Sequence, residues 1–140
     1  MAKTICTILG ALFILVGLVG FAAPGLGGFH LSTPHNLIHL ISGAVALYLG
    51  LKGTLASARL FCIVFGLVYL LLGVVGYLVG SNTQHTIPGL THSGTDSNLL
   101  QVIPSSLELA SIDHGLHILL GLIFLIGGFL TKADVRRAVD

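Results

Sequence analysis

Four long apolar segments, separated by polar ones, make up most of this chain. They cover residues 4–23, 37–51, 60–80 and 115–131. Each comes close to the roughly 20 helical residues that cross the hydrocarbon core of a bilayer. The pattern therefore predicts an all-α membrane protein that forms a single domain over residues 1–140. In this domain four transmembrane helices form a bundle, at about 4–23, 34–52, 58–80 and 106–131. A long outer loop is expected at 81–105.

Two of these helices are expected to begin before their apolar segment, because the preceding residues carry helix-start signals. Thr33 followed by Pro34 supplies an N-cap and a first-position proline for the second helix. Ser105 and Glu108 have the spacing of a capping box. We therefore expect the fourth helix to begin near residue 106, outside the membrane, and to enter the membrane near Ile112.

Composition supports the membrane class. The chain is 54% hydrophobic and only 8% charged, with a mean hydropathy of +1.02, whereas ordinary soluble domains are about 25% charged. With so few basic residues, nucleic acid is not an expected partner. The lipid bilayer is the expected environment, in a bacterial cytoplasmic membrane or in a thylakoid or other photosynthetic membrane.

The basic residues orient the predicted helices. All six fall at the two chain ends and in the segment 52–59: Lys3, Lys52, Arg59, Lys132, Arg136 and Arg137. Because Lys and Arg are enriched in cytoplasmic loops, both termini and this short segment are expected to be cytoplasmic. Segments 24–34 and 81–111 are then expected on the outer side.

The two halves of the chain repeat each other. A shift of 56 residues superimposes Cys6 on Cys62, Gly10 on Gly66, Gly17 on Gly73 and Gly20 on Gly76. A shift of 78 residues superimposes His39 on His117, Gly43 on Gly121 and Gly50 on Gly128. The second shift is larger because the second outer loop is longer. The repeat predicts two helical hairpins related by a pseudo-twofold axis along the membrane normal.

Each predicted helix also carries two glycines seven residues apart: Gly10 and Gly17, Gly43 and Gly50, Gly66 and Gly73, Gly121 and Gly128. Seven residues are close to two helical turns, so both glycines of a pair lie on one face. In lipid, small residues hold helices together because they let the backbones approach closely. We therefore expect Gly17, Gly50, Gly73 and Gly128 at helix–helix contacts.

Histidines provide the candidate chemistry. All seven lie in the outer loops or in the outer turns of the second and fourth helices, at positions 30, 35, 39, 85, 92, 114 and 117. His35 and His39 share one helix face, as do Asp113 and His117, and His114 is three residues before His117. Neutral imidazole ligates Zn, Cu, Fe and the Mg of chlorophyll-type rings, and a neighbouring carboxylate can fix the imidazole tautomer.

These residues allow three interpretations. His39 and His117 are candidate axial ligands of a haem or chlorophyll-type tetrapyrrole. His35, His39, Asp113, His114 and His117 are candidate ligands of a metal ion, for which Zn or Cu is less favoured than a tetrapyrrole. The structural alternative is that the imidazoles only form hydrogen bonds to backbone carbonyls of neighbouring helices or loops.

Two phrases in the sequence resemble a known family. HNLIHLISG at 35–43 and DHGLHILLG at 113–121, each half preceded by a glycine-rich helix, resemble the bacterial membrane family called domain of unknown function 4383. Its members have Asn or Asp three or four residues before a His and Gly four residues after it, which matches Asn36, His39 and Gly43, and Asp113, His117 and Gly121. The resemblance covers nearly the whole chain and implies a four-helix membrane architecture without an established activity.

No motif of a known enzyme class is present. The chain has no Cys-x-x-Cys-His haem attachment, phosphate-binding loop, serine elbow or carboxylate pair within a predicted helix. We therefore expect a non-enzymatic protein, with an accessory or scaffold subunit of a larger membrane complex as the leading hypothesis and other membrane-protein subunits as its partners. The alternatives are a pigment or haem binder that uses His39 and His117, and a metal-ion binder or permease with an extracytoplasmic histidine cluster.

Overall fold

The computed structural model describes residues 1–90 and 94–132, so that His92, Arg136 and Arg137 lie outside the described residues. The described chain is mostly helical. Its elements are α1 (Ala2–Ala22), a 3-10 turn η1 (Leu26–Gly28), α2 (Thr33–Leu51), α3 (Leu55–Val79), β1 (Ser81–Thr83), β2 (Asp96–Ile103), β3 (Leu107–Leu109) and α4 (Ser111–Leu130).

Three of the helices, α1, α3 and α4, are long and apolar enough to cross a membrane. The remaining long helix, α2, has 19 residues. It is less apolar because its first two turns contain Pro34, His35, Asn36 and His39. Length and composition therefore support membrane crossing for three of the four predicted spans.

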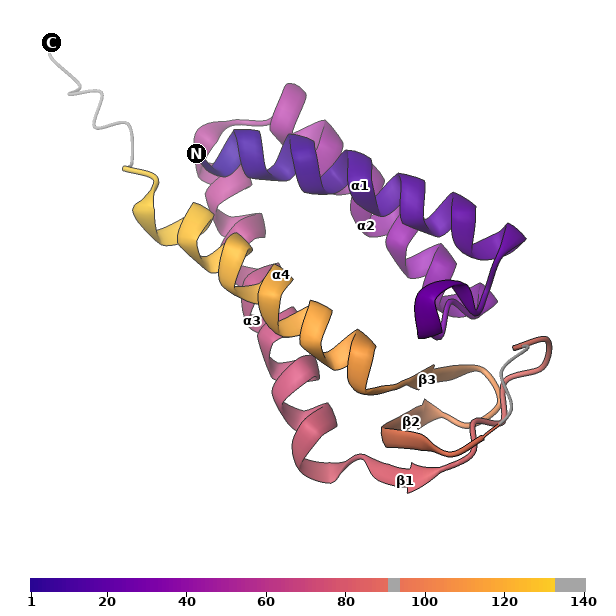
Figure 1. The fold of residues 1–140 in the computed structure, drawn as a ribbon. Helices are drawn as coiled ribbons and strands as arrows, with labels where there is room; N and C mark the ends of the chain where they lie inside the picture. The colour runs from indigo at the N-terminus through magenta and orange to yellow at the C-terminus, as the bar shows by residue number, and fades with distance from the viewer. Residues whose placement is uncertain (91–93, 133–140) are drawn as a thin grey trace, which may run out of the picture.

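The helices pack as two pairs, α1 with α2 and α3 with α4 (Figure 1). The start of α1 and the end of α4 lie at one end of the bundle, where the Ala2 N–H donates to Thr131 Oγ1 at 2.7 Å. The 3-10 turn and the three strands lie at the other end (Figure 1). This second end carries the outer loops predicted from the sequence, and we call it the cap end.

Glycines allow the close approach within each pair. A Cβ atom on Gly43 would lie 2.9 Å from the Gly10 carbonyl oxygen, and one on Gly121 would lie 2.6 Å from the Leu70 nitrogen. Such distances leave no room for any other residue. The predicted helix contacts are confirmed at all four positions, because an added Cβ would also clash with the neighbouring helix at Gly17, Gly50, Gly73 and Gly128.

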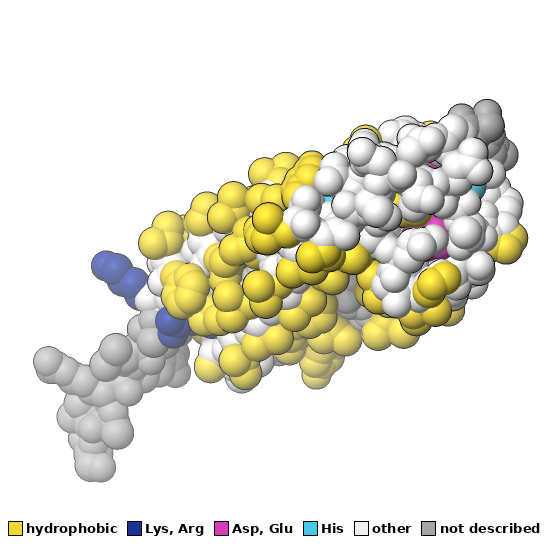
Figure 2. Space-filling model, turned by 90° about the horizontal axis from the view of Figure 1, so that it is seen from below, with side chains coloured by type: hydrophobic (Ala, Val, Ile, Leu, Met, Phe, Trp, Pro, Cys, Tyr) yellow, Lys and Arg dark blue, Asp and Glu magenta, His cyan; other side chains and the backbone are white. Residues whose placement is uncertain are grey.

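Side chains on the surface form three zones. Figure 2 shows hydrophobic side chains over the helices, Lys and Arg at one end, and at the other end mainly backbone and side chains that are neither hydrophobic nor charged, with a few Asp, Glu and His atoms. The apolar zone includes many exposed large residues, among them Leu18, Leu60, Leu71 and Leu78. An apolar belt between two polar ends suits a protein that lies within a bilayer.

The prediction of an all-α chain, with a loop at 81–105 and a fourth helix from residue 106, is wrong for residues 81–110. Strands β1, β2 and β3 form an antiparallel sheet in that order, and α4 begins only at Ser111. Ser105 has φ of 63°, which is incompatible with the extended conformation of an N-cap. Glu108 lies in β3, and Asp113 instead caps α4 by accepting a hydrogen bond from the Ala110 N–H at 2.9 Å.

Glu108 organises the cap end. Its buried carboxylate accepts hydrogen bonds from the Thr86 N–H at 2.8 Å, the Ser105 N–H at 3.0 Å and the Gln101 side chain at 2.9 Å, and also from the Thr86 hydroxyl. Burial by itself would raise the pKa of Glu108, but these hydrogen bonds outweigh it and lower the pKa. The carboxylate therefore remains ionised at neutral pH and holds the segments on either side of β2 together.

Candidate functional site

Three of the five predicted site residues meet where the two helix pairs come together near the cap end. The His35 and His39 rings are stacked, with centroids 4.6 Å apart, and the His35 and His117 centroids are 6.0 Å apart. All three side chains are buried, although they lie on α2 and α4, which belong to different pairs. The structure thus brings together residues that the sequence placed on separate helices.

Aromatic side chains connect His39 to His117 through the centre of the bundle. Phe13 of α1 lies 5.2 Å from the His39 ring, and Tyr69 of α3 lies 5.2 Å from the His117 ring. The Phe13 and Tyr69 centroids are themselves 5.4 Å apart. The sequence analysis missed Phe13, although the shift of 56 residues that defines the repeat aligns it with Tyr69.

The histidines differ in their hydrogen bonding. His35 donates from Nδ1 to the His30 carbonyl oxygen at 2.7 Å, and His114 donates from Nε2 to the Asn98 carbonyl oxygen at 2.8 Å. Each of these rings ties its helix to a loop or strand at the cap end. His35 and His114 thus form hydrogen bonds to backbone carbonyls of the kind that the structural alternative describes.

His39 and His117 have no such bonds. Their Nδ1 atoms are buried and have no hydrogen-bond partner within the described part of the chain. The Nδ1 atom of His114 is also unpartnered, but that ring is held by its other nitrogen. Buried polar atoms in proteins are nearly always hydrogen-bonded, and leaving one without a partner costs about 1–3 kcal/mol. His39 and His117 thus retain hydrogen-bonding capacity that the described fold does not use.

Asp113 has a structural role. Its carboxylate accepts hydrogen bonds from the Ala110 N–H at 2.9 Å and from the His30 N–H at 3.4 Å. It therefore stabilises the N-terminus of α4 and ties it to the connection between α1 and α2. Among the described residues, it forms no hydrogen bond with His117, so it does not fix the tautomer of that imidazole as the spacing had suggested.

A cavity of about 250 Å³ lies beside the two unpartnered histidines, and we call it the histidine cavity. Its walls are apolar and come from α1, from the segment after η1 and from α4: Leu15, Val16, Val19, Phe29, Leu31 and Leu116. Its polar lining consists of His35, His39, Asp113 and His117. A smaller cavity of about 120 Å³ lies between α2 and α3, and His35 and His117 line it as well.

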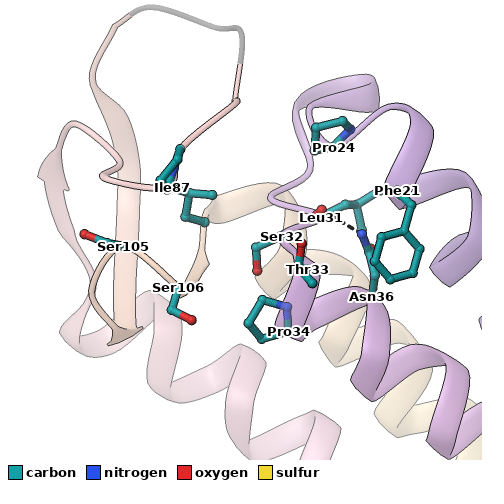
Figure 3. Close-up of a pocket in the computed structure, with 12 residues that line it drawn as sticks. Phe21, Pro24, Leu31, Ser32, Thr33, Pro34, Asn36, Ile87, Ser105 and Ser106 are labelled. Atoms are coloured by element: carbon teal, nitrogen blue, oxygen red, sulfur yellow. Dashed lines mark hydrogen bonds between the residues drawn. The ribbon is translucent and has the colours of Figure 1, made fainter.

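A third cavity, of about 270 Å³, lies at the cap end, between the start of α2 and the segments that contain Ile87 and Ser106 (Figure 3). Ser32, Thr33, Ser105 and Ser106 are among its lining residues, and beside it the Asn36 amide donates to the Leu31 carbonyl oxygen at 3.0 Å. Among its described lining residues none is His, Asp, Glu, Lys or Arg. It therefore offers less recognition chemistry than the histidine cavity.

The five predicted metal ligands separate into two groups. His35, His114 and Asp113 hold the cap end, whereas His39 and His117 remain unbonded. Within residues 1–90 and 94–132, no group of three or more His, Cys, Asp or Glu side chains is arranged to hold a metal ion. His39 and His117 are thus the two members of the predicted set that form no hydrogen bond with the described chain.

A second buried polar cluster joins the outer connections. His30 Nε2 lies 3.2 Å from Asp96 Oδ1, and the His30 and His85 rings are 5.4 Å apart. This cluster ties the α1–α2 connection to β2, which the sequence analysis did not anticipate because β2 itself was not predicted.

Comparisons with models of protein families, with curated proteins and with solved structures found no match to this chain. The resemblance to domain of unknown function 4383 therefore stays a prediction.

Proposed function

We propose that this protein is a non-enzymatic integral membrane protein that binds a ligand at its cap end through His39 and His117. The observation that supports this is the pair of buried imidazoles without hydrogen-bond partners, beside an apolar cavity. A ligand that reaches these imidazoles would give them hydrogen-bond partners that the described fold does not supply. The hypothesis of an accessory subunit has no comparable observation among the described residues, so we rank ligand binding first.

We further propose that α2 crosses the membrane with the other three helices, with both termini cytoplasmic. It packs along α1 at Gly10, Gly43 and Gly50 and turns back into α3 within a few residues. A helix paired in this way can bury its polar outer turns against protein rather than lipid. The four described basic residues support the orientation, because all lie near the ends of helices opposite the strands: Lys3, Lys52, Arg59 and Lys132.

The proposed pseudo-twofold relation is supported by matching contacts. A Cβ on Gly17 would approach the carbonyl oxygen of Asn36, and one on Gly73 would approach that of His114. The two contacts are equivalent, because the shift of 56 residues relates Gly17 to Gly73 and the shift of 78 residues relates Asn36 to His114. The Cys6 thiol points to the Ala58 carbonyl oxygen at 3.7 Å, and the Cys62 thiol points to that of Ala2 at 3.8 Å. His39 and His117 then occupy equivalent sites on the two hairpins.

Native mass spectrometry of protein extracted with its surrounding lipid tests the proposed function. We expect a bound non-protein mass in the wild type and in His85→Ala, and its loss in both His39→Leu and His117→Leu. An absorption spectrum of the same samples identifies the class of ligand. A Soret band indicates a tetrapyrrole, whereas a bound mass equal to that of Zn or Cu without a Soret band indicates a metal ion. A wild type without any bound mass, or one whose bound mass persists in both leucine variants, would refute ligand binding at this pair.

A further inference from the structure

We infer that the ligand of the histidine cavity is a quinone-type lipid, with one six-membered ring that carries hydrogen-bonding oxygens and with an apolar tail. This inference rests on the proposed function, because it assigns a ligand class to the same two histidines. It is argued from the volume of the cavity, the position of its polar groups, the absence of cationic side chains from its described lining, and its rim.

The volume favours a single ring. An apolar cavity of roughly 150 Å³ takes up one benzene molecule, and drug-sized ligands occupy pockets of about 300–1,000 Å³. The histidine cavity, at about 250 Å³, lies between these sizes. It suits one substituted six-membered ring and is too small to enclose all four linked rings of a tetrapyrrole.

The polar groups suit a ring with oxygens. The Nδ1 atoms of His39 and His117 are fully buried, so a ligand in the cavity would meet their Nε2 atoms. Depending on the tautomer, the Nε2 of a neutral imidazole donates to a quinone carbonyl or accepts from a hydroquinone hydroxyl. His35 and Asp113 also line the cavity, but their hydrogen bonds to the cap end already fix their orientation. Two unbonded imidazoles on different helix pairs can thus recognise a flat ring by its oxygens.

The charge of the lining argues against an anionic head group. Among the described residues that line the cavity, none is Lys or Arg, and the one carboxyl group is that of Asp113. A fatty-acid carboxylate or a lipid phosphate would enter an apolar site without a cation to balance it, which carries a large desolvation cost. A neutral head group avoids this cost.

The rim connects the cavity to the lipid-facing surface. Leu15 and Val19 on α1, Leu26 of η1, and Leu116 on α4 line the cavity and are also exposed on the apolar surface of the bundle. In a bilayer these side chains face acyl chains. A membrane-dissolved molecule can therefore enter sideways between α1 and α4 with its tail remaining in the lipid.

Photolabelling of the full-length protein in lipid nanodiscs tests this inference, with an azido-substituted ubiquinone analogue that carries one isoprene unit as the probe. We expect label on α1 around Leu15–Val19 and on α4 around Leu116, and competition by unlabelled short-tailed ubiquinone but not by palmitic acid. His39→Leu and His117→Leu should each weaken labelling by about tenfold or more, the effect of losing one hydrogen bond in an apolar site. Val16→Phe, which fills the cavity without changing a histidine, should also block it.

The outcomes separate the two proposals. If the wild type is not labelled, if labelling is unchanged in both leucine variants and in Val16→Phe, or if palmitic acid competes as well as ubiquinone, the quinone inference is overturned. If the quinone inference is overturned but native mass spectrometry still detects a bound mass that depends on His39 and His117, the proposed function stands with another class of ligand. If neither labelling nor any bound mass depends on His39 and His117, both proposals fail.

Discussion

At the scale of single residues, two histidines on one helix face have opposite relations to the fold. His35 donates a 2.7 Å hydrogen bond to the His30 carbonyl, whereas His39, one turn later, has a buried and unpartnered Nδ1 atom. On α4, His114 is bonded and His117 is not. Each helix thus pairs one histidine that is hydrogen-bonded to the cap end with one that has no hydrogen-bond partner in the described chain.

Stability measurements on ligand-free protein should separate the two roles. His35→Leu leaves the His30 carbonyl without a donor, so we expect it to lower the free energy of unfolding by about 1–3 kcal/mol. His39→Leu removes a polar group that had no partner, so it should leave the stability unchanged or raise it. Denaturant unfolding in mild detergent, followed by circular dichroism, measures both. Equal losses in the two variants would show that His39 also stabilises the fold.

At the scale of elements, glycines determine how closely the helices of each pair approach. Gly73 faces α4, where an added Cβ would lie 2.6 Å from the His114 carbonyl oxygen. Gly115 of α4, in contrast, has only the Tyr77 hydroxyl near the position of a Cβ, at 3.3 Å. The same substitution at these two glycines therefore tests whether the α3–α4 contact depends on backbone proximity.

We expect Gly73→Ala to separate α3 from α4 and to cost about 1–3 kcal/mol, the usual range for overpacking. Gly115→Ala should be neutral or stabilising by up to about 1 kcal/mol, because alanine favours the helix and the Tyr77 side chain can move aside. Thermal unfolding of both variants in the same detergent provides the comparison. If Gly73→Ala is as stable as Gly115→Ala, the helices are not held at the distance seen here.

At the scale of the whole molecule, the apolar belt between a basic end and the cap end predicts one orientation in the membrane. Gln84 is exposed at the cap end and Ala56 is exposed in the first turn of α3, at the opposite end. The native Cys6 and Cys62 are fully buried, so they should contribute little background in a thiol-labelling experiment.

A membrane-impermeant maleimide added to intact cells should label Gln84→Cys and not Ala56→Cys. Permeabilised cells should give labelling of both variants, which controls for expression and reactivity. The reverse pattern in intact cells would place the histidine cavity on the cytoplasmic side and would contradict the orientation derived from the basic residues.

Local sequence was sufficient for the helices but not for the strands. Apolar runs placed α1, α2 and α3 close to their observed bounds, and the glycine spacing predicted which positions lie at helix contacts. The N-cap of α2 is Ser32, however, and not Thr33 as predicted. Strands β1, β2 and β3 were not predicted, because β1 and β3 have only three residues each. In addition, β1 pairs with a segment further along the chain, Ser81 with Leu99. Glu108 matched a capping box locally, yet its carboxylate bonds to Thr86, 22 residues away.

The sequence by itself determined that the protein is apolar, helical and basic at one end, because hydropathy, helix periodicity and charge belong to each residue regardless of its neighbours. It also selected His39 and His117 through their matching positions in the repeat. Only the tertiary structure decided that these two rings, which line a cavity, form no hydrogen bond with the described chain, whereas His35 and His114 are each held by one. Whether a buried imidazole is satisfied depends on which carbonyl from another segment lies about 3 Å away, and folding alone sets that distance.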